Sequence, residues 1–596
     1  MSAIVFMGAY YGACIYALWK GGLAAQVKNL YVKLSVAHKV TAVLVILSGI
    51  VLTVYWTHQN QFIYYWDYGG YWRMSIQRME YLFSHNYLES MVSFFASVNQ
   101  DDYNCFLPSV IAMALKIFGC GFPTYVLINH VLFLLPAVFV QALCVGKLAA
   151  GSGREQGRTF LIALAAGVLF PANYYAMYLG YIDVGILLPV SAAMYLLIGS
   201  DFEKVDVSRD ASLGLVLVVV WICRRYTAFF IIGYVAALAV KACALLWKKR
   251  TLRTLGRIAG HFGVIGGVSV GVLLIFFNQF FIHALSTDYG EMYSAYDAPF
   301  FEKLRGLTGA FGAVTLITVA VAGILCVVTR RNRLELVSFM TLVVVETAAF
   351  WQTQAMGVHH RMLVNVPLFL CCMLVWTVPI REGNWSQGWK RMAGNVAAVL
   401  CTLALTVNFC AAMLPLPLPG SAGGLFSERY RPLRRGDIGQ LEELAEYLNG
   451  ETAGTEKKIY IAASGTVLNH DILRRLYAPE TMNAVPNMLV TSDVDLRDGF
   501  QPAFLEAEYV VVTAPVQLHL ASGQELVRYP AELIQDGMSY MGRHFQEVKR
   551  FELDGGVTAK VYRKVSDWEQ SDLEQMRGYF DGLYPGHEDL FGGRIP

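Results

Sequence analysis

The chain has 596 residues, of which 56% are hydrophobic and only 15% are charged. With long apolar runs along most of its length, this composition excludes an ordinary soluble globule and predicts a multi-span membrane protein. The formal net charge of +2 does not indicate nucleic-acid binding, because the basic residues are interspersed along the chain and form no single basic face.

The cysteines and the N-terminus give little chemistry. All 11 cysteines precede the polar C-terminal part and form no CxxC pair, which favours small core side chains over a disulfide framework or a zinc site. The N-terminal stretch MSAIVFMGAYYGACIYALWK has no basic residues before its apolar run. It therefore predicts a first membrane span rather than a cleaved signal peptide.

The apolar runs predict a membrane bundle of about twelve helices. They cover residues 3–19, 40–56, 122–146, 159–177, 183–199, 211–223, 226–247, 258–281, 307–329, 335–350, 362–379 and 394–413. Several are shorter than the roughly 20 residues that a straight spanning helix needs. The short pair in VVVWICRRYTAFFIIGY predicts helices that are broken at one face of the membrane, beside a cavity.

Basic residues set the predicted orientation, because they cluster in every second loop and such loops are cytoplasmic. They are Lys20, Lys28, Lys33, Lys39, Lys147, Arg154, Arg158, the basic residues of 248–257 and 330–333, Arg381, Lys390 and Arg391. The loops 57–121 and 282–306 and everything after about residue 414 are then outside. The mixed apolar and polar spacing in the first of these loops predicts interfacial helices.

The C-terminal part changes character after the Pro/Gly-rich LPLPLPGSAGGLF. We predict a membrane domain over 1–413, a linker over 414–430 and an extracytoplasmic α/β domain over 431–596. KKIYIAAS, AEYVVVTA, FQEVKRFEL and VTAKVYRK are typical of strands, whereas IGQLEELAEYLNG and YPAELIQDGMSYMGRHF are typical of helices.

A single carboxylate, Asp67, stands in the aromatic stretch QFIYYWDYGGYWR after an apolar run. One interpretation is an aromatic belt at the interface with one solvated acid. A binding site is the alternative, because Gly69 and Gly70 allow close approach of the backbone to a ligand. The rings of Tyr68 and Trp72 would supply stacking faces for a sugar. Asp67 is thus a candidate general base for an alcohol.

The same loop continues with NQDDYNCFLPS, which places Asp101, Asp102 and Tyr103 before an amphipathic segment. A turn or helix N-cap is one interpretation, since Asp and Asn favour both. The other is an acceptor site or a site for a divalent cation such as Mg²⁺ or Mn²⁺. Asp67 and Asp102 are the candidate metal ligands.

A span, an outward loop opening with WDYGGYW, and DYNCFLPSVIAMALKIFG before the next span resemble the integral-membrane GT-C glycosyltransferases. This group includes the bacterial aminoarabinose transferases and the protein O-mannosyltransferases. The resemblance covers residues 40–410 in architecture. It implies a polyprenyl-phosphate sugar as donor and a first-loop Asp, here Asp67, as catalytic base. The chain departs from the group in having one more span before this loop, and WDYGGYW where many members carry an Asp-Glu pair.

Arg224 and Arg225 lie between two short apolar runs on the predicted outer side, where exposure to lipid would be costly. They either snorkel to headgroups or bind a phosphate through a guanidinium fork. The resemblance implies that basic residues near this point hold the donor phosphate.

Two further groups interrupt or end later spans. His359, His360 and Arg361 follow one span and predict a nearby polar ligand; the resemblance implies the lipid phosphate. Glu346 interrupts LVVVETAAF inside a span. It predicts a buried acid facing the protein interior, either paired structurally or binding substrate.

Together these residues predict transfer of a sugar from a polyprenyl-phosphate donor to an acceptor hydroxyl by single displacement on the outer face of a bacterial plasma membrane. The leaving phosphate needs electrostatic stabilisation rather than a general acid. The predicted partners are membrane lipids, the lipid-linked sugar and an envelope glycan, lipid or protein acceptor. The alternatives are a transporter or flippase of lipid-linked saccharides, which needs no base, and a membrane anchor for the α/β domain.

Overall fold

The computed structural model describes residues 2–149, 153–377, 388–414 and 424–596. The chain forms two compact units. Unit 1 comprises residues 1–59, 71–287 and 298–432, and unit 2 comprises residues 60–70, 288–297 and 433–596. Arg381 and residues 415–423 of the predicted linker lie outside the described ranges.

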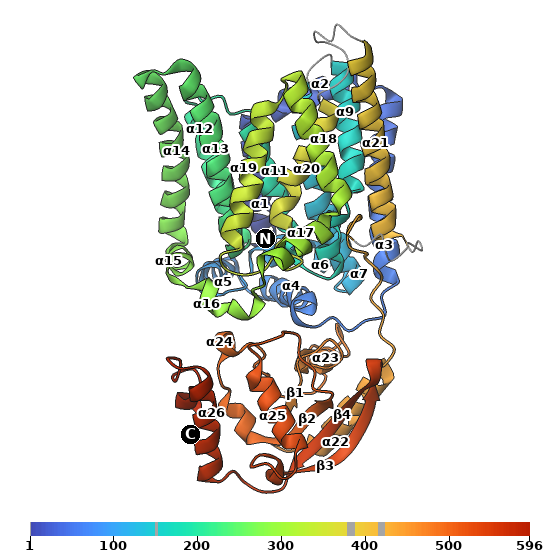
Figure 1. Ribbon diagram of the computed structural model, residues 1–596, viewed down its shortest axis with the longest axis vertical. Coiled ribbons are helices and arrows are strands. Elements are labelled where there is room, and N and C mark those ends of the chain that lie inside the picture. The colour runs from blue at the N-terminus through green and yellow to red at the C-terminus, as the bar shows by residue number, and fades with distance from the viewer. Residues whose placement is uncertain (1, 150–152, 378–387, 415–423) are drawn as a thin grey trace. The chain divides into compact units, whose positions relative to one another are not determined.

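Unit 1 is helical, as the apolar runs predict (Figure 1). Its helices are α1 (Ser2–Lys20), α2 (Leu23–Lys33), α3 (Val36–His58), α4 (Trp66–Ser84, which begins in unit 2), α5 (Tyr87–Gln100), α6 (Phe106–Phe118), α7 (Phe122–Asn129), α8 (Leu135–Leu148), α9 (Gly153–Val168), α10 (Tyr175–Tyr178), α11 (Leu187–Ile198), α12 (Val207–Cys223), α13 (Ala228–Lys249), α14 (Leu252–Phe276), α15 (Asn278–Ser286), α17 (Phe300–Phe311), α18 (Ala313–Thr329), α19 (Arg333–Phe350), α20 (Met362–Thr377) and α21 (Gly388–Met413).

The helices of unit 1 make this a membrane protein. Among the described residues, six helices are long and apolar enough to cross a membrane, and eight are if each of two bent helix pairs is one span. The pair of α17 and α18 bends by 86°. Within the described ranges, each of the twelve predicted runs falls in one helix or in consecutive short helices. The higher count from the sequence therefore includes runs that are broken or short.

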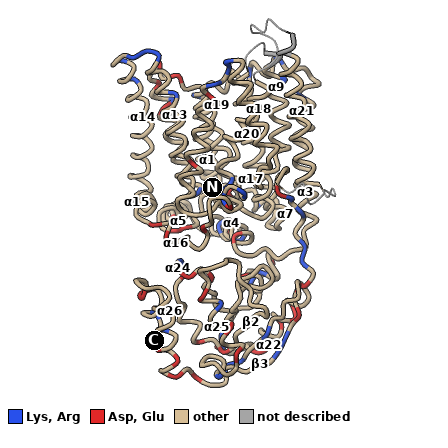
Figure 2. Tube along the Cα trace, viewed as in Figure 1, with Lys and Arg blue, Asp and Glu red and all other residues tan. Residues whose placement is uncertain are grey.

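Charge is sorted along these helices. In Figure 2 the long helices of unit 1 are almost free of charged residues along their middles, and blue residues gather at one end. The free-energy cost of placing charge in hydrocarbon explains the uncharged middles. The blue end corresponds to the loops that the sequence pattern predicts to be cytoplasmic.

The predicted helix break between residues 223 and 226 is confirmed. α12 ends at Cys223, and Arg224 is extended, with φ −156° and ψ 133°. A short 3-10 turn, η4 (Arg225–Thr227), leads into α13. The break frees backbone groups, and the Thr227 hydroxyl donates to the carbonyl oxygens of Val220 and Arg224, each at 2.7 Å. Both arginines are therefore held outside regular helix.

The first long loop is helical as predicted. α5 begins with a capping box in which Asn86 and Glu89 each accept from the other's backbone N–H, an arrangement that fixes a helix start. α6 is largely buried, and Leu107 and Val110 are among its buried residues. A helix so apolar on most sides packs within unit 1 rather than standing in solvent.

Unit 2 contains an α/β fold. Its strands are β1 (Lys458–Ala462), β2 (Ala507–Ala514), β3 (Phe545–Leu553) and β4 (Val557–Lys564), in the order β1-β2-β4-β3. β1 and β2 are parallel, and the other two pairings are antiparallel. The helices are α16 (Tyr289–Met292), α22 (Ile438–Thr452), α23 (His470–Arg474), α24 (Asp495–Asp498), α25 (Glu525–Gln535) and α26 (Gln570–Leu583).

The four predicted strands and the first predicted helix of this part are confirmed. The second predicted helix, over 529–545, is wrong beyond Gln535, where α25 ends. The chain then folds back: a Cβ on Gly542 would lie 2.0 Å from the carbonyl oxygen of Asp536. Only glycine permits that approach, so the turn replaces a continued helix.

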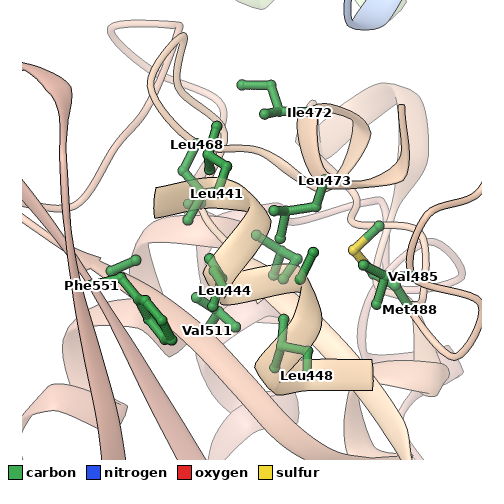
Figure 3. Packing of buried hydrophobic residues seen from close by; sticks show 14 of the residues in the cluster. Leu441, Leu444, Leu448, Leu468, Ile472, Leu473, Val485, Met488, Val511 and Phe551 are labelled. Carbon is green, nitrogen blue, oxygen red and sulfur yellow. The ribbon is translucent and has the colours of Figure 1, made fainter. Parts of the chain in front are cut away.

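One of two hydrophobic cores of unit 2 lies between α22 and the sheet (Figure 3). Leu441, Leu444 and Leu448 of α22 are fully buried beside Val511 of β2. Burying one such side chain contributes about 1.5–3 kcal/mol to stability. Ile63 and Tyr65, from the segment that carries Asp67, belong to the same core.

Candidate functional site

The centre of the site in unit 1 is an ion pair at the helix break. Arg224 Nε lies 2.8 Å from Asp183 Oδ1, and the two side chains are 10% and 0% exposed. Asp183 comes from the 3-10 segment η3 (Ile182–Ile186), just before α11. Tyr226 donates its hydroxyl to the same carboxylate oxygen at 2.6 Å. A buried charge must be paired in this way to be tolerated.

Tyrosine rings surround this pair. The Arg224 guanidinium lies 4.7 Å from the ring centre of Tyr71, 5.4 Å from that of Tyr103 and 5.7 Å from that of Tyr226. Arg224 also donates a hydrogen bond to the Tyr71 hydroxyl. The rings stabilise the cation through their π faces and offer flat surfaces to a ligand. We call Tyr71, Tyr103, Tyr181, Asp183, Arg224, Tyr226, His359 and His360 the Arg224 cluster.

His359 and His360 join the Arg224 cluster through ring contacts. The His359 ring stacks on Tyr181, with centres 4.5 Å apart and planes 16° apart. Burial, and next the nearby Arg224 charge, lowers the pKa of His359 well below its usual range, and burial does the same for His360. Both imidazoles are then neutral at pH 7. A phosphate in this cluster would therefore meet its positive charge at Arg224.

Arg225 and Arg361 point into separate ion pairs. Arg225 contacts the exposed Asp102 carboxylate and donates to the Asp101 carbonyl oxygen at 2.9 Å. Arg361 Nη1 lies 2.8 Å from Glu428 Oε2. These pairs occupy part of each guanidinium, so Arg225 and Arg361 are less available to an anion than the sequence pattern indicates.

Two polar atoms of the Arg224 cluster, Asp183 Oδ2 and His359 Nδ1, are buried without a hydrogen-bond partner in the part of the chain that the structure describes. Leaving such atoms unpaired costs free energy, which a ligand hydroxyl would recover. A buried cation, an open carboxylate oxygen and several rings together suit a phosphorylated sugar.

Asp67 and Tyr68 lie in unit 2. Asp67 is half-buried in the first turn of α4, where a carboxylate is favoured by the helix dipole. The preceding residue, Trp66, packs its ring 4.6 Å from the ring of His519. Trp66 has a φ of 46°, in the left-handed region. Residues other than glycine rarely adopt this conformation, and it is concentrated at functional sites.

Trp72 and Glu346 lie in unit 1. Trp72 Nε1 donates to the Cys120 carbonyl oxygen at 2.8 Å. Glu346 is fully buried in α19, and neither carboxylate oxygen has a hydrogen-bond partner among the described residues. Its Cβ lies against Gly233 of α13.

The predicted divalent-cation site stays a prediction. No group of three or more His, Cys, Asp or Glu side chains gathers within the described ranges. The candidate ligand Asp102 is paired with the Arg225 guanidinium and has His283 3.8 Å away. The Arg225 guanidinium opposes binding of a metal cation at Asp102.

Asp183 and Tyr226 are the residues that sequence reasoning missed. Asp183 interrupts the apolar stretch YLGYIDVGILLPV at the start of a predicted span. An acid at that depth is by itself a sign of function or pairing. The signal was therefore present for Asp183, whereas Tyr226 gave none beyond its position beside Arg225.

Comparisons with known proteins yield distant structural likenesses. No protein-family model and no curated protein sequence matches the chain. The structure of ArnT from Cupriavidus metallidurans bound to undecaprenyl phosphate is similar with a TM-score of 0.46 and 12% identity, over 89% of this chain and 99% of that chain. The structure of the archaeal oligosaccharyltransferase AglB from Archaeoglobus fulgidus, in complex with an inhibitory peptide and a dolichol-phosphate, is similar with a TM-score of 0.45 and 12% identity, over 88% and 74%. Likenesses this distant assign no residue or reaction to the chain.

Proposed function

We propose that this protein transfers a sugar from a polyprenyl-phosphate donor to an acceptor hydroxyl on the outer face of the plasma membrane. The observation that carries the proposal is the buried Arg224–Asp183 pair within the aromatic Arg224 cluster. Arg224 supplies the charge that a phosphate requires. Asp183 Oδ2 supplies an acceptor for a sugar hydroxyl. The resemblance of the WDYGGYW loop to GT-C enzymes supports the same donor class.

The proposed reaction is a single displacement. The acceptor oxygen attacks the anomeric carbon as the bond to the phosphate oxygen breaks, and the configuration at that carbon inverts. The departing phosphate keeps the bonding electrons and needs only electrostatic stabilisation, which we assign to Arg224. Asp67 takes the proton of the acceptor hydroxyl, a role that contributes a factor of about 10²–10⁴ in rate.

The experiment is transfer from a panel of radiolabelled polyprenyl-phosphate sugars to extracted envelope material. We expect Asp67→Asn to lower the rate by about 10²–10⁴-fold while leaving donor binding in place. Glu80→Gln is the matched control, because it removes an exposed acid from the same first loop. Equal transfer by wild type and Asp67→Asn would move the base to another acid, and Asp183→Asn would then be compared.

A flippase of lipid-linked saccharides is the competing function. It would use the Arg224 cluster for binding and would need no base. Such a protein would bind the lipid-linked sugar and move it across liposome membranes, but form no transfer product in wild type or in any variant. Absence of product with every donor, together with movement of the lipid, would overturn the transferase proposal.

A further inference from the structure

The segment that carries Asp67 is built into the α/β fold of unit 2. Gln61 forms a parallel bridge with Arg434. The Gln61 N–H donates to the Leu433 carbonyl oxygen at 2.8 Å, and the Arg435 N–H donates to the Gln61 carbonyl oxygen at 2.9 Å. These bonds join residues more than 370 positions apart in the sequence. The segment is therefore fixed at its start by backbone pairing.

Apolar side chains fix the middle of this segment. Ile63 and Tyr65 are 5% and 3% exposed, and both lie in the core formed by α22, β1 and β2. Phe62, Trp66 and Tyr68 pack against the same core. Five residues around Asp67 thus depend on unit 2 for their position.

Asp471 fixes the turn at which Asp67 begins α4. The Trp66 N–H, which a helix start leaves without an internal partner, donates to Asp471 Oδ2 at 2.5 Å. Asp471 is itself held by Arg475 Nε at 2.8 Å, with side chains 3% and 5% exposed. The hydrogen bond from the Trp66 N–H to Asp471 comes from outside the helix and stabilises the left-handed conformation of Trp66.

Arg475 also touches the backbone just after Asp67. A Cβ on Gly69 would lie 2.6 Å from Arg475 Nη1 and 2.2 Å from the Tyr64 carbonyl oxygen. Only glycine fits between these two groups. Gly70, by contrast, has open space around its Cβ position. The first turn of α4 therefore packs against the Arg475 guanidinium.

These contacts lie beside the carboxyl ends of the parallel strands. Ser464 follows β1 and His519 follows β2, and the Ser464 hydroxyl is 2.9 Å from His519 Nδ1. The carboxyl edge of parallel strands is where α/β folds bind their ligands. Here Trp66 and Tyr296 pack their rings against His519. In unit 2, segments 60–70 and 288–297 occupy the position of a ligand.

We infer that Asp471 and Arg475 are positioning residues for Asp67, and that unit 2 is part of the catalytic apparatus rather than an appended binding module. The inference rests on the proposed function in that Asp67 is the base. Asp471 and Arg475 act through the backbone of Trp66 and Gly69, and neither takes part in the bond changes.

The test uses the full chain in lipid nanodiscs and two readouts. Hydrogen exchange of the peptide covering residues 62–68 reports on the segment without reference to activity. Steady-state transfer reports kcat and the KM for the polyprenyl-phosphate sugar. For Asp471→Ala we expect exchange about tenfold faster or more and a kcat about 10–100-fold lower, because small misplacements of a reacting group are costly. The KM should change less than about twofold, a split that general instability would not give.

Asp471→Asn separates the hydrogen bond from the ion pair. Its amide oxygen still accepts from the Trp66 N–H, so we expect exchange near that of wild type and recovery of most of kcat. If Asp471→Ala fails to fold, the same two readouts on Gly69→Ala and its control Gly70→Ala decide the inference, because only the former disturbs the contact with Arg475.

Asp572→Asn is the matched control. The Asp572 side chain is 3% exposed, as is that of Asp471, and its carboxylate lies 2.8 Å from both Arg543 Nη2 and His544 Nε2. We expect this variant to lower the stability of unit 2 without changing exchange at 62–68 or kcat.

Unchanged exchange in Asp471→Ala would overturn the inference, as would faster exchange with a normal kcat. Full activity of Asp67→Asn is a separate result: it would remove the base from the proposed function while leaving the exchange result to decide the contact between Asp471 and the segment.

Discussion

The surroundings of Arg224 in unit 1 and of Asp67 in unit 2 differ in what holds each residue in place. Arg224 is held by its own charge, through Asp183 and the tyrosine rings. Asp67 is held by its backbone, through Asp471 at one side and Gly69 at the other. Because Arg224 is positioned by an opposite charge, its position is sensitive to the loss of Asp183.

Loss of Arg224 is expected to have the largest effect on stability. Arg224→Ala leaves the Asp183 carboxylate buried without its counter-charge, and breaking such a pair costs about 3–5 kcal/mol. Transfer should also fall below detection. The measurement is thermal unfolding in detergent together with the transfer assay.

Arg225→Ala is the control for this prediction. Its partner Asp102 is 57% exposed, and exposed pairs contribute about 1 kcal/mol or less. The double variant Arg224→Ala/Asp183→Asn should be more stable than Arg224→Ala alone. Equal losses for the two arginine variants would show that burial of the pair is unimportant.

Gly69→Ala tests the close backbone packing that positions Asp67. The added Cβ would meet the Tyr64 carbonyl oxygen at 2.2 Å, and forced overpacking of this kind costs about 1–3 kcal/mol. The rate of sugar transfer should also be lower in Gly69→Ala than in wild type. Gly70→Ala is the matched control, since nothing lies within 4 Å of its Cβ position, and its helix propensity should rise. Similar behaviour of the two variants would contradict the predicted close approach.

The stability of unit 2 is expected to depend on pH, with a smaller effect than those of the variants above. Burial lowers the pKa of His519 from its ordinary value, and burial also lowers the pKa of His470. The unfolded chain then binds protons more readily than the folded chain below about pH 6.5. Stability should therefore fall as pH drops from about 6.5 toward the folded pKa.

His519→Gln isolates the share of this dependence that belongs to His519. Asp493 and Asp495, whose pKa values are raised by burial, contribute with the opposite sign and are present in both proteins. The measurement is the difference in unfolding temperature between wild type and variant across about pH 5–7.5. A difference that does not vary with pH would refute the prediction.

Chelation should have the smallest effect. No cluster of three metal-binding side chains is formed by the described residues, and Asp102 is committed to Arg225. We expect EDTA to change the transfer rate less than about twofold, a difference near 0.4 kcal/mol in barrier. Loss of transfer that is restored by Mg²⁺ or Mn²⁺ would place a cation in the reaction.

The sequence predicts local features of this fold well and distant pairings poorly. The four strands and the helix break at Arg224 follow from alternation, apolar runs and charge, all of which are local. The helix over 529–545 fails because the fold-back at Gly542 depends on a contact with Asp536 rather than on propensity.

The candidate site shows the same limit. Asp67 and Arg224 stand out in the sequence because each is a charge in an apolar or aromatic setting. Asp471, which accepts from the Trp66 N–H, and Asp183, which pairs with Arg224, come from segments about 400 and 40 residues away. A single sequence does not specify such contacts. Residues 60–70 likewise belong to unit 2 through contacts with residues far away in the sequence.

The order of the sheet has a consequence for association between copies of the protein. β3 is an outer strand, and outer strands offer unpaired backbone groups on which a second chain can aggregate. The exposed residues of β3 include Lys549, Arg550 and Glu552. A second copy pairing with this strand would have to desolvate these charged side chains. The charges on β3 therefore oppose edge-to-edge association of two chains.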